Sequence, residues 1–395
     1  MNRGRDEVRI RRLNEHMQQA GLDFLILRLP ENVLYATGYW PVFGASMAVV
    51  PAEGDATVFY IDGEQLFVAD GWVADARPYK YFDLEQMASP NRSLGEMLLA
   101  LWRERGYDAG AQVGYEGSFE LVAANNIGAE VRVPSESGVE MLRCILPKAN
   151  LQDASHMLRA ARLIKSPAEV EMMRLANELA CHGYAAAREV MIPGLKDAEV
   201  SAAVEARIYS RGVGYKGLRR ARGFCHALSG PNAAMGENPY FISSPRALER
   251  GDVVLIELDT FADGYFSDLS RTMCVGEPDS RSQDVWGVVN EALETMLTAI
   301  KPGVPARELN RLAWEVVKKH GYPEGFVHHA GHGIGLQFHE PPTLHPTSNE
   351  LLSEWMVISL EPHCYIPGWG GVRIEENVVV THSGYELLSI YPRGL

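Results

Sequence analysis

The sequence has few cysteines and no pattern among them. Its 395 residues contain five, an odd number, scattered along the chain and never spaced as C-x-x-C. Neither a disulfide framework nor a zinc knuckle is expected, and a reducing cytoplasm is the favoured location. The five are Cys144, Cys181, Cys225, Cys274 and Cys364.

The chain also lacks an excess of basic residues and a long apolar run. Its 37 Lys and Arg stand against 51 Asp and Glu, and the net charge of −14 would repel nucleic acid and anionic lipid. The basic run 211–222 holds one aromatic residue, which favours a solvated face or a substrate-anion site. The amino terminus has no apolar segment typical of a signal peptide, and glycines and prolines interrupt the uncharged stretch 32–52. We expect no nucleic-acid partner and no membrane partner.

The length and the composition predict two globular domains. The chain is 46% apolar and 22% charged, as in ordinary folded proteins, and 395 residues exceed one typical domain. In residues 1–155, helical and strand patterns alternate, which indicates an α/β layer. The sequence Ser166-Pro167-Ala168-Glu169 is a capping box that begins an amphipathic helix. We therefore expect a companion domain over 1–155 and a second domain over 156–395.

The second domain reads as α+β. Helical patterns lie beside strand-like runs, several of which can pair as antiparallel neighbours. The expected helices span 167–189, 197–210, 283–300 and 305–319. The expected strands span 253–261, 265–273, 356–361 and 372–380.

Three acidic residues lie inside the two strand-like runs of the expected hairpin 251–273. Carboxylates are costly inside strands, so Glu257, Asp259 and Asp268 are candidate functional residues. Positions i and i+2 of one strand share a face, and so do residues directly opposite each other on paired strands. If Asp263-Gly264 forms a two-residue turn, Asp259 faces Asp268, and all three acids can point to one side.

Two later segments add histidines and further acids. His328, His332 and His339 occur among glycines in the run 327–342, and Glu361 and Glu375 each follow apolar, strand-like residues. Carboxylates with a neutral imidazole suit divalent Mn, Co, Zn or Fe, and two such ions sharing carboxylates can hold one hydroxide between them. The alternative is a network of structural ion pairs with the arginines at positions 271 and 373.

The order of these motifs resembles one family. The acid hairpin, Gly331-His332-Gly333 with a trailing His339-Glu340, and the later LEP and GVRIE segments are similar to the pita-bread metallopeptidases. These include Xaa-Pro aminopeptidase, prolidase and methionine aminopeptidase, with creatinase as a metal-free relative. The resemblance spans roughly 160 to 385. The first 150 residues resemble the companion domain of the prolidase and creatinase branch.

The resemblance implies a role for each matching residue. Asp268, His332, Glu361 and Glu375 match metal ligands, with Asp268 and Glu375 bridging two ions. Glu361 also matches the proton-transferring base, and His328 and His339 match contacts to substrate and intermediate. Arg373 would brace the Glu375 carboxylate beside the substrate.

Three departures from the family pattern concern the site. Glu257 stands where the family has an aspartate ligand, and Asp259, two residues on, could supply the missing carboxylate. Glu237 stands at a position that carries a substrate-contacting histidine in the family, and His363 replaces the glycine of the usual EPG. These changes bear on proline specificity more than on metal binding.

The sequence therefore predicts a metal-dependent hydrolase of small amide or peptide substrates, with two divalent ions and a bridging hydroxide. An Xaa-Pro dipeptidase or aminopeptidase is favoured. The alternative is a creatinase-like C–N hydrolase or a small-substrate lyase on the same scaffold, because fold does not fix chemistry. A binding module that has lost activity would lack the matched ligands. The resemblance also implies a homodimer.

Overall fold

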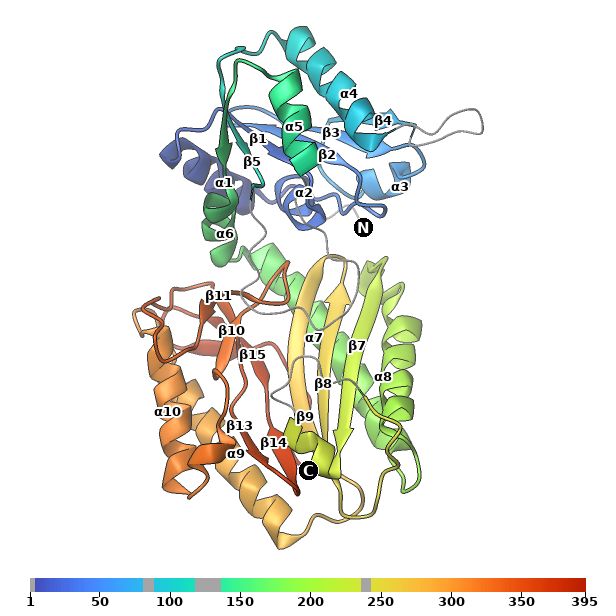
Figure 1. The fold of residues 1–395 in the computed structure, drawn as a ribbon, viewed down its shortest axis with the longest axis vertical. Helices are drawn as coiled ribbons and strands as arrows, with labels where there is room; N and C mark the ends of the chain where they lie inside the picture. The colour runs from blue at the N-terminus through green and yellow to red at the C-terminus, as the bar shows by residue number, and fades with distance from the viewer. Residues whose placement is uncertain (1–3, 81–88, 118–135, 236–242) are drawn as a thin grey trace. The chain divides into compact units, whose positions relative to one another are not determined.

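The computed structural model divides the chain into two compact units, the first ending at Arg162 and the second beginning at Leu163 (Figure 1). The sequence placed this boundary after residue 155. The helix that begins there packs on the first unit, because the Tyr35 hydroxyl donates to the Ala161 carbonyl at 2.7 Å. The residues that the structure describes are 4–80, 89–117, 136–235 and 243–395.

The first unit is a mixed sheet with helices, which confirms the expected α/β layer. The six strands lie in the order β4-β3-β2-β1-β5-β6, with β1 parallel to β5 and antiparallel to β2. The strands are β1 (Phe24–Leu27), β2 (Met47–Pro51), β3 (Thr57–Ile61), β4 (Asp75–Tyr79), β5 (Gln112–Tyr115) and β6 (Asn150–Asp153). The helices are α1 (Glu7–Gln19), α2 (Pro30–Thr37), α3 (Gln65–Val68), α4 (Pro90–Arg105), α5 (Glu136–Ile145) and α6 (Ser155–Leu163).

The second unit begins with the helix that the capping box predicts. The Ser166 side chain accepts from the Glu169 backbone N–H, and the Glu169 side chain accepts from the Ser166 N–H. The helices are α7 (Pro167–Val190), α8 (Asp197–Gly212), α9 (Ser280–Ala299) and α10 (Ala306–Lys319), with 3₁₀ turns η1 (Tyr215–Gly217), η2 (Gly230–Met235) and η3 (Pro323–Gly325).

The strands that the structure describes in the second unit form three antiparallel sheets, in the orders β7-β8-β9, β11-β10-β12-β15-β16 and β13-β14. They are β7 (Ala221–Ser229), β8 (Val253–Ala262), β9 (Tyr265–Cys274), β10 (Gly331–Gly333), β11 (Glu340–Thr343), β12 (Val357–Leu360), β13 (His363–Ile366), β14 (Gly370–Arg373), β15 (Glu376–Val380) and β16 (Tyr385–Leu387).

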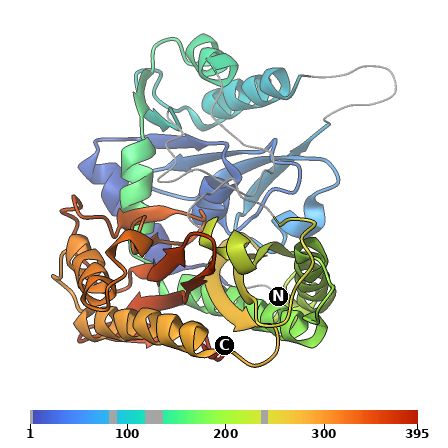
Figure 2. The same ribbon diagram turned by 60° about the horizontal axis from the view of Figure 1, so that its bottom comes forward.

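Helices cover the sheets of the second unit in two pairs. The α7 and α8 helices pack on the β7-β8-β9 sheet, and α9 packs on β13 and β14 beside α10 (Figures 1 and 2). Apolar residues of α9, α10 and the strands β12 to β15 form one core. These apolar residues pack the helices against the sheets, and the buried acids described below lie on the strands β8 and β9 or at the ends of strands.

The prediction of one strand over 372–380 was wrong in one respect, because this segment forms two strands in different sheets. Its first part pairs with β13 and its second part with β12. Between them the Glu375 N–H donates to the Ser270 carbonyl of β9 at 3.1 Å, outside either ladder. This change of sheet places Glu375 where the sheets meet.

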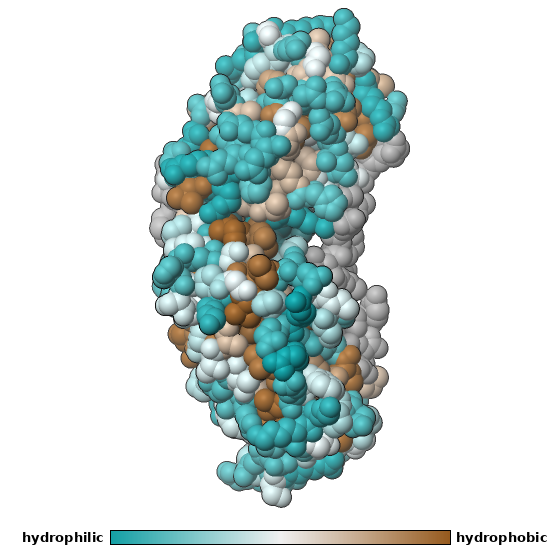
Figure 3. Space-filling model, turned by 90° about the vertical axis from the view of Figure 1, so that its left-hand side faces the viewer, coloured by the Kyte–Doolittle hydropathy of each residue, from teal (hydrophilic) through white to brown (hydrophobic). Residues whose placement is uncertain are grey.

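Figure 3 shows the hydropathy of one face of the molecule. Hydrophilic residues dominate the face in Figure 3, with apolar side chains interspersed among them. Within the described ranges, none of the helices has both the length and the apolar character needed to cross a membrane.

Candidate metal centre and active site

The hairpin of β8 and β9 brings two aspartates face to face. Asp263 and Gly264 both have positive φ, at 44° and 103°, and form the two-residue turn that suits the twist of paired strands. The resulting register places Asp259 directly opposite Asp268, as the sequence predicted. Both are buried, and neither carboxylate oxygen of Asp259 has a hydrogen-bond donor among the described residues.

The short strand β10 delivers His332 to these acids. A Cβ atom on Gly331 would lie 2.1 Å from the Ser359 carbonyl oxygen, and one on Gly333 would lie 2.0 Å from that of Pro341. Only glycine therefore fits on either side of His332. Its Nδ1–H donates to the Gly333 carbonyl at 2.8 Å, which leaves the Nε2 lone pair facing Asp268 Oδ2 at 3.1 Å.

Glu361 lies at the end of β12 among three histidines. Its Oε1 is 3.2 Å from His329 Nδ1 and 3.9 Å from His332 Nε2, and its Oε2 is 3.9 Å from His328 Nδ1. Burial opposes ionisation, but the hydrogen bond and the charge of His329, whose own pKa is raised beside Glu361, lower the pKa of Glu361. Glu361 is thus held as a carboxylate.

Glu375 is fully buried between two serine hydroxyls. Ser359 donates to Oε1 at 2.6 Å, and the Ser270 hydroxyl lies 2.8 Å from Oε2. Burial and the nearby Glu361 charge raise the pKa of Glu375 to about 7. Burial and the Glu375 charge also raise the pKa values of Asp259 and Asp268 well above the ordinary range.

Arg373 is the one buried arginine that contacts carboxylate groups of this cluster within the described part of the chain. It forms an ion pair with Glu257, donates from Nε to the Ser270 hydroxyl at 2.7 Å, and lies 3.6 Å from Glu361. Its Nε is 3.9 Å from Glu375, so Glu257 and not Glu375 is its principal carboxylate. The structure therefore gives Glu257 a partner that Asp259 lacks.

The described residues fit a pair of divalent cations. Donor atoms of His332, Glu361 and Glu375 lie within 4.8 Å of one another, and so do those of Glu257, Asp268 and Glu375, so the two groups share Glu375. The cluster has five carboxylates and one guanidinium, and two divalent ions would supply the missing positive charge. Two acceptors that face each other, His332 Nε2 and Asp268 Oδ2, are what a cation between them would require.

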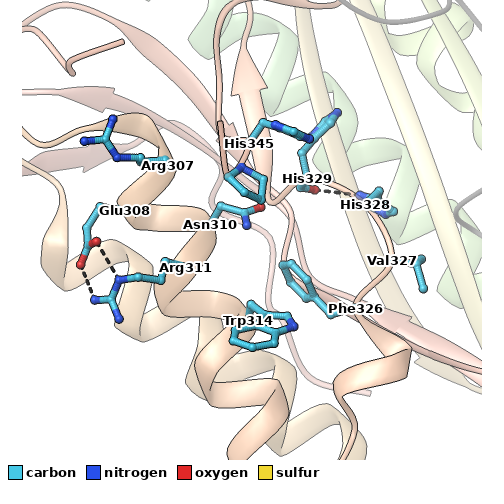
Figure 4. Close-up of a pocket in the computed structure, with 11 residues that line it drawn as sticks. Arg307, Glu308, Asn310, Arg311, Trp314, Phe326, Val327, His328, His329 and His345 are labelled. Atoms are coloured by element: carbon cyan, nitrogen blue, oxygen red, sulfur yellow. Dashed lines mark hydrogen bonds and ion pairs between the residues drawn. The ribbon is translucent and has the colours of Figure 1, made fainter. Parts of the chain in front are cut away.

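A cavity of about 550 Å³ lies on the other side of the histidine segment (Figure 4). Trp314 of α10 and Phe326 line it, and His328 and His329 form part of its wall. The dashed lines in Figure 4 join Glu308 to Arg311 and the His328 ring to the His329 carbonyl. His328 and His329 thus border both the acidic cluster and this cavity.

The structure brings together nearly all of the residues that the sequence singled out. His339 also lies in the cluster, because its ring is 3.9 Å from that of His332 and one of its ring nitrogens lies within 4.8 Å of donor atoms of Asp268 and His332. Glu237 lies outside the described residues. Sequence reasoning did not assign a role to His329, which contacts Glu361 directly. Its place beside His328 was the available signal, but adjacent loop residues can face the same site in ways that no strand or helix period predicts.

Comparison with known proteins agrees with this arrangement. Residues 171–382 match the family model for metallopeptidase family M24, and residues 9–164 match the creatinase/prolidase amino-terminal domain. The chain therefore belongs to metallopeptidase family M24.

Full-length relatives place it in the prolidase branch. The chain is 28% identical to an Xaa-Pro dipeptidase from Pyrococcus furiosus over 98% of its own length and 99% of the relative. The solved prolidase from that organism covers 96% of this chain and all of its own, with a TM-score of 0.76 and 28% identity. The prolidase from Pyrococcus horikoshii covers 98% and 99%, with a TM-score of 0.78 and 27% identity. The chain is an enzyme of the metal-dependent peptidase class, with the expected two-domain pita-bread architecture.

Proposed function

We propose that this enzyme hydrolyses Xaa-Pro dipeptides or similarly short peptides, with two divalent metal ions bound in the acidic cluster. The observation that carries the proposal is the meeting of two potential ligand groups at Glu375, in a cluster whose carboxylates exceed its cations. The Xaa-Pro dipeptidase relatives match nearly the full length of the chain and support the substrate class.

Each ligand has a role in this proposal. Asp268, Glu375, His332 and Glu361 would hold the two ions, and either Glu257 or Asp259 would supply the remaining carboxylate. The ions would supply positive charge that lowers the pKa of a water molecule and polarises the scissile carbonyl. Mn, Co, Zn and Fe all suit this mixture of carboxylate and imidazole.

The protein's own groups handle the proton and the substrate. Glu361, held ionised by its histidine neighbours, accepts a proton from water and passes it to the leaving nitrogen. His328 and His339 contact the substrate, and Arg373 holds Glu257 and Ser270 beside it. Glu237 is a further substrate contact, at the position where the family carries a histidine.

Assembly and location complete the proposal. We infer that the enzyme works as a homodimer in the cytoplasm, as the resemblance to the prolidase branch and the scattered cysteines led us to expect. All five cysteines are free thiols, which is compatible with a reducing compartment.

Metal analysis combined with a substrate panel tests the proposal. Purified enzyme should contain about two divalent ions per chain. Prolonged chelation should abolish hydrolysis of Xaa-Pro dipeptides, and Mn or Co should restore it. Full activity in protein shown to be metal-free would overturn the proposal of two metal ions. Metal-loaded enzyme that cleaves no Xaa-Pro dipeptide would overturn the proposed substrate class.

A further inference from the structure

His363 packs against His328, and it occupies the position where the family pattern has glycine. It is fully buried, and its ring lies nearly parallel to three neighbouring rings. The centroid distances are 3.6 Å to His328, 4.5 Å to Phe326 and 4.8 Å to Tyr365. A glycine could make none of these contacts.

The hydrogen-bond partners of His363 define its tautomer. Its Nδ1 faces the Glu361 carbonyl oxygen at 3.1 Å and must donate to it. Its Nε2 accepts from the backbone N–H of Val327 at 3.0 Å and from that of His328 at 3.4 Å. A neutral ring with its proton on Nδ1 satisfies all three contacts, so the imidazole joins the Glu361 segment to the loop that carries His328.

Both ring nitrogens of His328 also form hydrogen bonds. Its Nδ1–H donates to the His329 carbonyl at 2.8 Å, which leaves Nε2 to accept from the Tyr365 hydroxyl at 3.3 Å. That hydroxyl accepts from Arg373 Nη1 at 3.3 Å. His328 is therefore connected to the acidic cluster through Tyr365 and Arg373, and its backbone is connected to Glu361 through His363.

We propose that His363 is a positioning residue, which fixes the backbone at Val327 and His328 and thereby sets the His328 ring against the substrate. The part that concerns substrate rests on the proposed function. The part that concerns the loop rests on the contacts alone, and it can be tested without any catalytic assay.

The first experiment measures amide hydrogen exchange in His363→Phe. Phenylalanine keeps an aromatic ring in the stack and removes all three hydrogen bonds. Exchange at Val327 and His328 should accelerate about tenfold, the equivalent of one lost hydrogen bond. His363→Gln, which retains a possible acceptor, should restore part of the protection. The control is His320→Phe, whose imidazole pairs with Glu291 at the surface. Unchanged exchange in His363→Phe would overturn the proposal.

The second experiment is a double-mutant cycle with His328→Ala. If His363 acts through His328, His363→Phe should lower kcat/KM about 10-fold to 100-fold in the wild-type background and less than about twofold in the His328→Ala background. An equal loss in both backgrounds would show an independent structural effect and overturn the proposal. Should the wild-type enzyme cleave no peptide, the proposed function fails, and the exchange measurement still decides whether His363 positions the loop. If His363→Phe does not fold, the same cycle is run with His363→Gln.

Discussion

Glu375 and Glu376 are adjacent in the sequence and both buried, yet their surroundings are opposite. Glu376 accepts hydrogen bonds from Arg271 at 3.1 Å, from Arg393 at 2.6 Å and from the Ser389 hydroxyl. Glu375 has two serine hydroxyls and an arginine nitrogen 3.9 Å away, and it lies among other carboxylates. One carboxylate is matched by cations of the chain and the other is not.

The comparison separates a structural acid from a candidate ligand. A buried charge is tolerated when it is paired and hydrogen-bonded, and Glu376 meets that condition within the protein. The acids around Glu375 would meet it with cations from solution. Burial alone therefore does not identify functional acids, but several buried carboxylates gathered without countercharge do.

The largest expected effect is on turnover, and it comes from Glu361, one of the acids in the cluster around Glu375. Glu361→Gln keeps the size of the side chain and removes its charge and its base. Turnover should fall by about 10³-fold or more, because proton transfer and a metal ligand are both affected. In the metal-free protein, the free energy of unfolding should fall only slightly, because glutamine keeps a hydrogen-bonding side chain beside His329 and loses only the charge of that pair. Steady-state kinetics and urea unfolding in chelator measure the two quantities.

The control for this prediction is Glu315→Gln, which removes a surface carboxylate paired with Arg311. It should leave turnover unchanged. Near-normal turnover in Glu361→Gln would show that Glu361 belongs to the structural class.

Glu376, which is paired with arginines, should show the opposite result: a loss of stability without a loss of metal. Glu376→Gln leaves Arg271 without its carboxylate inside the core, and breaking a buried pair costs about 3 to 5 kcal/mol. The free energy of unfolding should fall by that amount, while the metal content of the folded protein stays at the wild-type value. Loss of metal without loss of stability would remove the distinction between the two neighbours.

A finer test concerns Glu257 and Asp259, which share one face of the hairpin. Donor atoms of Glu257 lie within 4.8 Å of Asp268 and Glu375, but Arg373 already neutralises its carboxylate. Asp259 faces Asp268 and has no such partner. We therefore expect Asp259→Ala to lose about one metal ion per chain and Glu257→Ala to retain both.

Metal stoichiometry of the two purified variants decides between the carboxylates. Loss only in Glu257→Ala would assign the ligand to Glu257, as the family pattern has it. Two ions retained in both variants would make this face of the hairpin structural.

Much of this arrangement was predictable, and the part that was not has a physical reason. The register of Asp259 and Asp268 followed from a period of two and a turn sequence, which are local signals. The switch between sheets at Glu375 was not predictable, because β-branched residues typical of strands occur on both sides of it, at Val372 and Ile374 and at 378–380. The role of His363 also depended on tertiary structure, since its partners at Val327 and His328 are more than 30 residues away. Local patterns place residues on strands, and contacts between strands decide which of them meet.

The smallest expected effect concerns the stability contributed by Glu116 in the first unit. Glu116 is a third kind of buried acid, to be compared with Glu375 and Glu376. It accepts only from neutral groups, the backbone N–H groups of Arg28 and Leu29 and the Asn32 amide. Burial raises its pKa to about 7, although these hydrogen bonds oppose the shift. Between about pH 4.5, the ordinary value, and pH 7, the folded state therefore retains a proton that the unfolded state has released, so stability falls as pH rises through this window. The loss should total about 2 to 3 kcal/mol.

Glu116→Gln cannot titrate, so the unfolding free energy of the wild type relative to this variant should decrease by that amount from pH 5 to pH 8. The surface variant Glu53→Gln controls for the rest of the chain, and a difference between wild type and Glu116→Gln that does not change with pH would show that the N–H donors alone keep this carboxylate ionised.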